Sequence, residues 1–509
     1  MTSAHAVDAV RAAEESAAAD LPEGLATLVG RASAALARVV GGQLRDVAGS
    51  VYGARLVLLV GSGTNGGDAL HAGALLARRG AAVTALLAAG RAHGPGLVAL
   101  RAAGGRVLED GAGARGRAAV AGADVVVDGL LGVGGRPGLA GDAAALAGAA
   151  ARARARVVAV DVPSGVDVTT GAVPPPAEPG GASAVRADVT VTFGTAKPCL
   201  LLPPASALAG RVVVAPIGLA EDDLGDPVVE RLGAAELAAR WPRPHGESDK
   251  YSRGVLGVVA GGATYTGAAV LSTGAAVRAG AGMVRYLGPV PPTDLVRARW
   301  PEVVPGPGRV QAWLLGPGVD PDDEGQGEHV REALAQDVPC VVDAGALPAL
   351  VTALDEGERG TGSTLVVPHA GELVRFLGLL GHECDREDVV ARPLELAQRA
   401  ADLSGVVVLL KGSTTLVVAP GTDGSRLPVR AQADGTPWLA TAGSGDVLAG
   451  VVGALAALGL AARDAGSLGA AVHGLAAHAA SGGGPLHAEA VLHALPEVVT
   501  ALLEDVPRA

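Results

Sequence analysis

Four residues, Gly443-Ser-Gly-Asp446, combine two features that phosphoryl transfer to a hydroxyl group requires. The small residues predict a turn, and the apolar run 447–462 predicts a buried helix directly after it. Backbone N–H groups at such a turn, together with the positive end of the helix dipole, bind anions such as phosphate. Asp446 would stand beside that anion, where a carboxylate takes the proton of an attacking hydroxyl. The alternative is that Asp446 only caps the helix.

A second set of polar residues follows predicted buried strands in the first half of the chain. Asn65 and Asp68 come after strand 56–60, and the others end or follow strands 123–128 and 157–161: Asp128, Asp161 and Ser164. Ligands of parallel sheets bind beyond the carboxyl ends of the strands. Oxygen donors gathered there could hold a hard cation and leave one carboxylate for acid–base catalysis. The alternative is that the aspartates only cap helices or shape turns.

Glycines 61, 63 and 66 match the dinucleotide-binding pattern G-x-G-x-x-G between a strand and a helix. The next predicted strand, at 83–87, ends without the acidic residue that would hold a ribose. The sequence therefore disfavours an ordinary NAD redox site.

Some residue types are scarce in this chain. It has three lysines and one asparagine, while arginine is abundant: Lys197, Lys250, Lys411 and Asn65. Where composition favours arginine, a lysine that remains is more often one whose compact ammonium group arginine cannot replace. The scarcity of lysine therefore favours a functional role for Lys411, which follows the predicted strand 406–410. The alternative for Lys411 is a solvated residue in a hairpin.

Length and charge set broader limits on the class of protein. The chain has 509 residues, which predicts two domains. Its net charge of −12 argues against a nucleic-acid surface. The three cysteines have neither metal-binding nor disulfide spacing, and residues 1–8 do not resemble a signal peptide. We therefore expect a cytoplasmic protein without a membrane span.

Buried strands alternate with loops and helices along the whole chain, which predicts an α/β fold with two doubly wound domains. The acidic stretch 221–227 and the Trp/Pro-rich stretch 241–245 predict a boundary between about 222 and 245. We therefore expect a Rossmann-like domain over 1–222 and a second, ribokinase-like domain over 245–509.

Residues 1 to about 220 resemble the NAD(P)H-hydrate epimerase family. The matching motifs are Thr64-Asn-Gly-Gly-Asp68, Asp128-Gly-Leu-Leu-Gly-Val-Gly134 and Asp161-Val-Pro-Ser-Gly-Val-Asp167. The resemblance implies potassium ligands at Asn65, Asp128 and Ser164, with Asp161 as the catalytic residue. It implies that the hydrated nicotinamide nucleotide is bound by Thr64, Asn65, Gly66, Gly67, Asp68, Gly132, Val133, Gly134, Gly135, Arg136, Pro137, Gly138 and Asp161. The chain departs from the family pattern at Thr64, at Ala69 and at 30–33.

Residues from about 245 to 505 resemble the ribokinase-like ADP- or ATP-dependent NAD(P)H-hydrate dehydratases. The matching stretches lie at 250–254, 265–268, 316–318, 368–372, 411–415 and 443–446. The resemblance implies that Asp446 is the base and that Ala268, Gly318, His369 and Asp446 contact the hydrate. It implies nucleotide contacts from Lys411, Gly412, Ser413, Thr414, Thr415 and Gly445, with Mg²⁺ accompanying the nucleotide. The alternative for His369, taken alone, is a structural role. Gly345 and Pro348 stand where the family has Asp and Asn.

Together the two resemblances imply repair of hydrated NADH and NADPH. One half would epimerise the R and S hydrates at nicotinamide C6, and the other would dehydrate the S form with ADP or ATP. Fold analogy suggests a homo-oligomer. Two alternatives remain at this point. One is a ribokinase-type kinase for a vitamin or another small alcohol, which leaves the first domain unexplained. The other is that the first domain binds nucleotide or protein without catalysis.

Overall fold

The computed structural model describes residues 1–178, 180–422 and 424–504. The chain forms two compact units. The first unit spans Ser3–Val229, and the second spans Glu230–Ala509 together with Met1–Thr2. Two short strands lie where the chain passes between the units, β1 (Thr2–Ala4) and β9 (Val229–Arg231).

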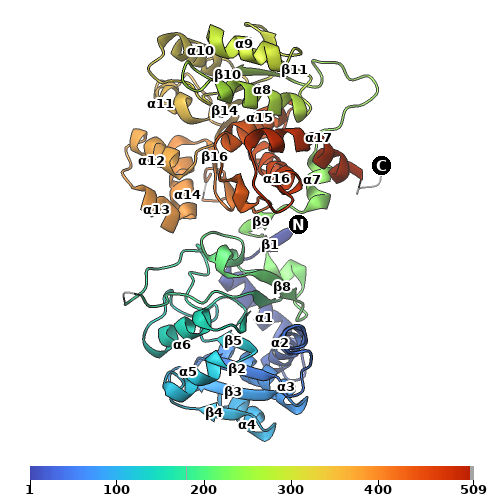
Figure 1. Cartoon of the computed structure of the whole chain (residues 1–509), viewed down its shortest axis with the longest axis vertical. Helices are drawn as coiled ribbons and strands as arrows, with labels where there is room; N and C mark the ends of the chain where they lie inside the picture. Colours follow the sequence, from blue (N-terminus) through green and yellow to red (C-terminus); the bar gives the residue numbers. More distant parts are fainter. Residues whose placement is uncertain (179, 423, 505–509) are drawn as a thin grey trace. The chain divides into compact units, whose positions relative to one another are not determined.

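The first unit contains a parallel sheet with the strand order β4-β3-β2-β5-β6-β7-β8 (Figure 1). Its strands are β2 (Arg55–Val60), β3 (Ala82–Leu87), β4 (Arg106–Leu108), β5 (Val125–Gly129), β6 (Arg156–Val160), β7 (Val189–Phe193) and β8 (Arg211–Ala215). Strands β5 and β7 are buried along their whole length, as expected for a sheet covered on both faces.

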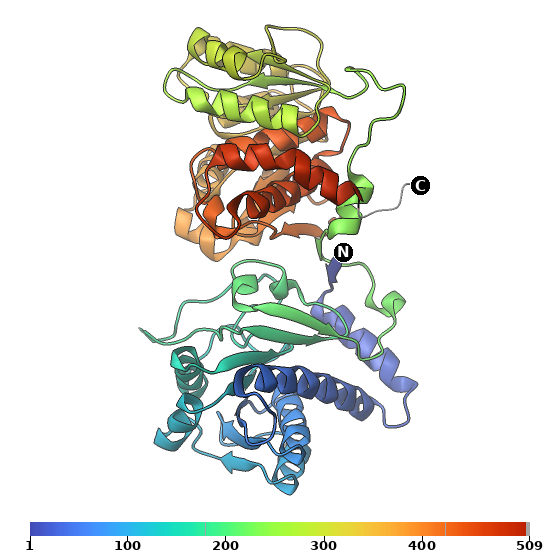
Figure 2. The same ribbon diagram turned by 45° about the vertical axis from the view of Figure 1, so that its right-hand side comes forward.

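Helices cover both faces of this sheet. They are α1 (Val7–Ala19), α2 (Leu25–Ala48), α3 (Thr64–Arg78), α4 (Gly94–Ala102), α5 (Ala114–Ala121) and α6 (Gly141–Arg152). Figure 2 shows the long helix α2 running across one face, where Leu36, Leu44 and Leu70 belong to one core cluster. The opposite face carries a second cluster that includes Val120 and Leu146 of α5 and α6.

The second unit contains a sheet with the strand order β18-β17-β16-β15-β14-β13-β10-β11-β12. Its strands are β10 (Val255–Val259), β11 (Met283–Leu287), β12 (Val304–Pro305), β13 (Ala312–Leu315), β14 (Cys340–Val342), β15 (Thr364–Val366), β16 (Val407–Leu410), β17 (Thr415–Val418) and β18 (Val429–Gln432). All neighbouring strands between β16 and β12 in this spatial order pair in parallel, including β10 and β11. The pairs β16-β17 and β17-β18 are antiparallel. Both sheets confirm the predicted α/β class.

The helices of the second unit are α7 (Ala234–Arg240), α8 (Thr266–Arg278), α9 (Val290–Arg299), α10 (Glu324–Leu334), α11 (Leu347–Asp355), α12 (Ala370–Leu379), α13 (Arg386–Ala391), α14 (Pro393–Ser404), α15 (Ser444–Ala457), α16 (Ala462–Ser481) and α17 (Ala488–Glu504). Helices α8, α15, α16 and α17 pack against one another. The helix predicted over 447–462 ends at Ala457, because Gly459 adopts a φ of 92° that breaks the helical path.

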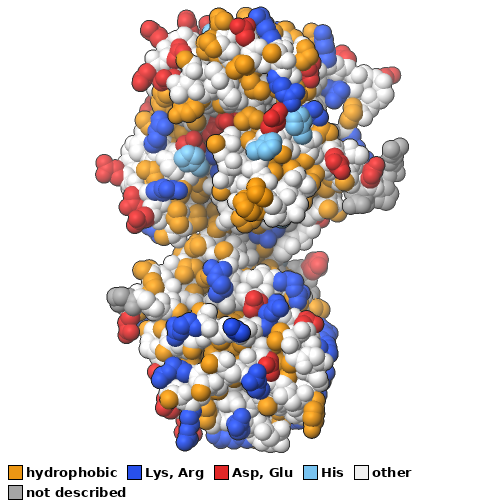
Figure 3. All heavy atoms as spheres, viewed as in Figure 1, with side chains coloured by type: hydrophobic (Ala, Val, Ile, Leu, Met, Phe, Trp, Pro, Cys, Tyr) orange, Lys and Arg blue, Asp and Glu red, His pale blue; other side chains and the backbone are white. Residues whose placement is uncertain are grey.

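Charged and apolar side chains are mixed on the visible surface (Figure 3). On the face drawn in Figure 3, acidic, basic and apolar side chains are interspersed on both units. Across the residues that the structure describes, none of the helices combines the length and hydropathy needed to cross a bilayer.

Candidate functional site

In the second unit, the predicted anion-binding turn lies at the start of α15. Gly443 is the N-cap residue of this helix with a φ of 84°, and a Cβ there would lie 2.6 Å from Leu271 Cδ1. Asp446 stands in the first turn, and no side chain caps the helix start. The first-turn N–H groups of a helix have no intrahelical acceptor. The turn therefore offers free donors beside a carboxylate, and the capping interpretation of Asp446 is wrong.

Lys411 lies against this turn. A Cβ on Gly445 would be 3.4 Å from Lys411 Nζ. The ammonium group donates a hydrogen bond to Asp343 Oδ1 at 3.0 Å, and its Nζ lies 3.3 Å from Glu372 Oε2. The Lys411 side chain is only 16% exposed, so it is not the solvated hairpin residue of the alternative interpretation, although it does follow β16 in a hairpin. The structure thus adds two carboxylates to the predicted Lys411 and Asp446.

The Asp446 carboxyl has a raised pKa. Burial raises the pKa to about 7, the charge of Asp343 adds to the rise, and Lys411 opposes it. Burial alone would lower the pKa of the Lys411 ammonium group. The charges of Asp343 and Glu372 outweigh burial, so this pKa is raised. A carboxyl that titrates near neutral pH suits a general base.

His369 has the structural role that was the alternative to hydrate binding. It is the N-cap residue of α12, and its Nδ1 accepts hydrogen bonds from the backbone N–H groups of Gly371 and Glu372. Its Nε2 lies 3.4 Å from Glu372 Oε1, and its side chain is 59% exposed. Through Glu372, His369 is connected to Lys411, so it also stands at the edge of the same charged group.

The remaining predicted hydrate contacts, Ala268 and Gly318, lie side by side. Gly318 has a φ of 64°, and a Cβ there would be 2.6 Å from Ala268 Cβ. In the predicted nucleotide segment, Gly412 and Ser413 are exposed, Thr415 is half-buried and Thr414 is buried.

The departure at Gly345 has a steric reason. A Cβ at this position would overlap the carbonyl oxygen of Val319, so the backbone here leaves no room for the family's Asp. Gly345, Val319 and Pro348 line a cavity of about 280 Å³ beside α10 and α11.

In the first unit, Asp128, Ser164 and Asn65 come together as predicted. Ser164 Oγ is 2.7 Å from Asp128 Oδ1, and Asn65 Nδ2 donates to the carbonyl oxygens of Leu131 and Val160 at 3.0 Å each. Asp128 is fully buried, and burial raises its pKa to about 6. If the Asn65 amide is rotated so that Oδ1 takes the place of Nδ2, the site has neutral oxygens from Asn65, Ser164, Leu131 and Val160. They accompany the single carboxylate of Asp128.

Such an oxygen-rich set with a single carboxylate fits a hard monovalent cation. Sites built from several acidic, histidine or cysteine side chains are a different case. Within residues 1–178, 180–422 and 424–504, no group of three or more such side chains is arranged to hold a metal ion.

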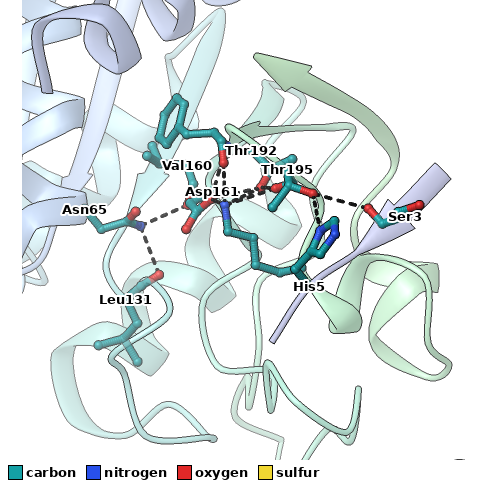
Figure 4. A network of polar contacts seen from close by, with 10 residues as sticks. Ser3, His5, Asn65, Leu131, Val160, Asp161, Thr192 and Thr195 are labelled. Atoms are coloured by element: carbon teal, nitrogen blue, oxygen red, sulfur yellow. Dashed lines mark hydrogen bonds and ion pairs between the residues drawn. The ribbon is translucent and has the colours of Figure 1, made fainter. Parts of the chain in front are cut away.

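Asp161 forms a buried ion pair with Lys197, at 2.7 Å between Oδ1 and Nζ. Figure 4 shows the surrounding network, in which Thr192 Oγ1 donates to Asp161 Oδ1 at 2.9 Å. Lys197 also donates to the carbonyl oxygens of Phe193 and Thr195, at 2.8 and 3.2 Å. Asp161 has a φ of 64°, a conformation rare for a residue with a side chain. Backbone strain of this kind occurs most often at functional sites.

Asp68 shares this region. Its carboxylate accepts a bond from Ser33 Oγ at 3.3 Å, and burial, with the charge of Asp161 next in size, raises its pKa to about 7. Within the same predicted loop, Gly66 has no room for a side chain because a Cβ would overlap the carbonyl oxygen of Gly61. On the facing loop, a Cβ at Gly132 would be 3.0 Å from the Asn65 amide.

Sequence reasoning missed three charged partners: Lys197, Asp343 as a partner of Lys411, and Glu372. The scarcity of lysine had singled out Lys197, but nothing local linked it to Asp161, 36 positions away. Such a pairing depends on the parallel neighbours β6 and β7, which bring both loops to one edge.

Both halves of the chain match known families. Residues 25–199 match the family described as YjeF-related protein N-terminus, and residues 256–491 match the family described as NAD(P)H-hydrate dehydratase. The chain is 44% identical over 462 residues to the bifunctional NAD(P)H-hydrate repair enzyme Nnr of Mycobacterium tuberculosis H37Rv, covering 90% of this chain and 89% of the relative. The chain belongs to the family of bifunctional NAD(P)H-hydrate repair enzymes.

Other members of this repair family are also similar. The Mycobacterium leprae repair enzyme is 42% identical over 479 residues, with 93% of each chain covered. A solved structure, the ADP/ATP-dependent NAD(P)H-hydrate dehydratase of Bacillus subtilis co-crystallised with ATP and Mg²⁺, is 24% identical. It covers 54% of this chain and 99% of its own, with a TM-score of 0.46.

Membership in the repair family confirms both resemblances found in the sequence. It also favours the repair enzyme over the vitamin kinase, because the match to whole repair enzymes includes the first unit.

Proposed function

We propose that the first unit epimerises the R and S forms of hydrated NADH and NADPH, and that the second unit dehydrates the S form with ADP or ATP. We assign these activities to residues 1–222 and 245–509. The proposal rests on the 44% identity to a bifunctional relative, which covers 90% of this chain. It also rests on a charged site at the strand ends of each unit. Helix α7 lies outside both ranges, yet its Leu237 and the C-cap residue Trp241 belong to the core of the second unit.

In the proposed dehydration, Asp446 takes the proton of the C6 hydroxyl as the hydroxyl oxygen attacks the terminal phosphate of the nucleotide. The amides of the turn and Lys411 stabilise the charge that develops on the transferred group. Phosphate then leaves C6 far more readily than hydroxide does, a proton leaves C5, and the double bond between C5 and C6 returns. Mg²⁺ would accompany the nucleotide as part of the co-substrate.

In the proposed epimerisation, the chemistry follows from the position of C6. This carbon carries a hydroxyl and is bonded to ring nitrogen N1, so it is a hemiaminal. Asp161 takes the hydroxyl proton, the C6–N1 bond breaks with its electrons moving to N1, and C6 becomes a carbonyl. N1 gains a proton in the same step. Closing the ring on the other face of the carbonyl gives the other epimer and returns both protons.

A direct test uses chemically prepared NADH hydrate, a mixture of both epimers, with ADP or ATP. Orthophosphate and the absorbance of restored NADH should increase together. A stable phosphorylated alcohol without restored NADH would instead support the kinase alternative.

We also propose potassium as the ion at Asn65, Asp128 and Ser164, held in addition by the carbonyl oxygens of Leu131 and Val160. The support is the chemistry of these donors: four neutral oxygens and one buried carboxylate, a set that leaves a monovalent ion nearly neutralised. Its expected role is to fix the loops after β2, β5 and β6 relative to one another.

The cation proposal predicts that K⁺ raises the melting temperature of the first unit more than Na⁺ does, because an ion that binds only the folded state stabilises it. Asp128→Asn should abolish this difference. Asp124→Asn is the matched control, since Asp124 pairs with Arg55 just before β5, at the opposite end of this strand from Asp128. Thermal unfolding at equal ionic strength in KCl and NaCl is the measurement. An equal response of the parent protein to both salts would contradict the proposal.

A further inference from the structure

Helix α1 contributes none of the residues discussed so far, yet the segment before it is attached to the loop that carries Lys197. His5 N donates to the carbonyl oxygen of Ala196 at 3.2 Å, and His5 Nδ1 lies 2.8 Å from Thr195 Oγ1. Thr195 Oγ1 donates in turn to the carbonyl oxygen of Ser3 at 3.3 Å (Figure 4). These bonds fix the start of α1 beside the Asp161–Lys197 pair.

Two faces of α1 differ in their contacts. Val10 and Ala13 are buried in a small cluster with Leu224. Arg11 and Glu14 are three residues apart, so they share another face of the helix. A Cβ on Gly134 would lie 3.3 Å from Arg11 Nη2, so the guanidinium group lies over the loop Gly132–Gly138.

The Arg11 guanidinium is weakly engaged. Its ion pair with Asp8 is long, at 3.6 Å, and both side chains are largely exposed. Exposed pairs of this kind contribute little free energy. Arg11 is therefore available to a phosphate group on the same glycine loop, where a guanidinium group can form two parallel hydrogen bonds.

Glu14 is half-buried on the helix whose start is bonded to the loop of Lys197, and the charges of Lys197 and Asp161 act on its carboxyl. Burial raises the pKa of its carboxyl, Lys197 opposes the rise, Asp161 adds to it, and Arg11 opposes it. The charge of Glu14 also raises the pKa of Asp68. Glu14 and Asp161 thus both interact with the ammonium group of Lys197, and the charge of each also acts on Asp68.

We propose that α1 is a wall of the epimerase pocket, in which Arg11 binds the pyrophosphate of the hydrated dinucleotide and the Glu14 carboxyl delivers the proton to ring N1. This inference rests on the proposed epimerase function. When Asp161 takes the hydroxyl proton and C6–N1 breaks, the electron pair on N1 takes the Glu14 proton. Ring closure returns that proton to Glu14, so the cycle needs no other reactant.

The assay follows the conversion of purified R hydrate to S hydrate by chromatography, without nucleotide, so that the dehydratase is silent. Arg11→Gln should raise KM about 10-fold and leave kcat nearly unchanged, because one charge-assisted contact to the non-reacting part is lost. Asp8→Asn is its control and should not raise KM. A KM for Arg11→Gln equal to that of the parent overturns the role of Arg11.

Glu14→Gln should lower kcat about 100-fold with little change in KM, and the residual rate should lose the alkaline limb of the pH profile. Glu14→Asp should recover part of the rate. Glu15→Gln is the matched control, because Glu15 is the exposed neighbour on the same helix.

Thermal unfolding of each variant checks that the first unit is folded, and the dehydratase of the same chain checks the second unit. A Glu14→Gln rate within twofold of the parent overturns the role of Glu14, as does an equal loss in Glu15→Gln. Loss of rate in Asp68→Asn alone would move the role to Asp68. If the parent protein itself converts no R hydrate, the proposed function has failed rather than the role of α1.

Discussion

Asp446→Asn should reduce the dehydration rate by about 10²–10⁴-fold while nucleotide binding persists. The amide cannot take the hydroxyl proton, but the turn amides and Lys411, which are proposed to hold the phosphate, are unchanged. Single-turnover measurements of restored NADH give the rate, and calorimetry with ADP gives the affinity. Full activity would remove Asp446 from the mechanism. A loss explained entirely by weaker nucleotide binding would mean that the residue serves binding and not proton transfer.

The pH dependence provides an independent check on Asp446. A base acts when it is deprotonated, so kcat/KM of the parent should rise with pH and level off above about 7, the raised pKa of this carboxyl. The residual rate of Asp446→Asn should lack that limb. Glu372→Gln removes a nearby negative charge that raises this pKa, so it should shift the limb of the parent profile to lower pH.

The same raised pKa predicts how stability changes. The folded protein holds the Asp446 proton more tightly than the unfolded chain does. The free energy of unfolding therefore decreases as the pH rises from about 4 to about 7. Asp446→Asn has no such group and should lose less stability over this window. Urea unfolding at pH 5 and pH 8 measures the difference, and it also shows that any lost activity is not lost folding.

Local patterns predicted the parts of each site that belong to one stretch of chain. Gly443 to Asp446 were identified because small residues, a carboxylate and a helix occur in direct succession. The same reasoning could not find Glu372 or Asp343 as partners of Lys411, because those contacts join the ends of three different strands. It also extended α15 by several residues, since a run of apolar residues does not reveal that Gly459 turns the backbone.

Backbone proximity was equally invisible in the sequence. Gly345 was noted only as a missing Asp, whereas the structure shows the carbonyl oxygen of Val319 where a side chain would begin. Likewise, Lys197 was noticed for its rarity alone. Its ion pair with Asp161 depends on the order of strands in the sheet, which fixes which loops are neighbours.

Asp161→Asn should divide the clearance of a mixed hydrate preparation into two phases. The dehydratase site is expected to accept one epimer, because the other places its hydroxyl on the opposite ring face, away from Asp446 and the phosphate. The parent protein should therefore clear the whole mixture in one phase with ADP present. The variant should clear the S fraction at the parent rate and then slow to the rate at which the hydrates epimerise unaided.

The substitution suits this position, since Asn tolerates the positive φ of residue 161. It does leave the buried Lys197 without its ionised partner, which lowers stability. The unchanged first phase reports that the second unit remains folded, thermal unfolding reports on the first unit, and Asp161→Asn/Lys197→Met removes both charges as a second form of the test. Adding the Asp446→Asn protein, whose first unit is intact, should restore the fast second phase by supplying only the epimerase. If Asp161→Asn clears the mixture as quickly as the parent, Asp161 is not the epimerisation catalyst. If the parent itself stalls after the S fraction, the departures at Thr64 and Ala69 have removed the epimerase activity from this chain.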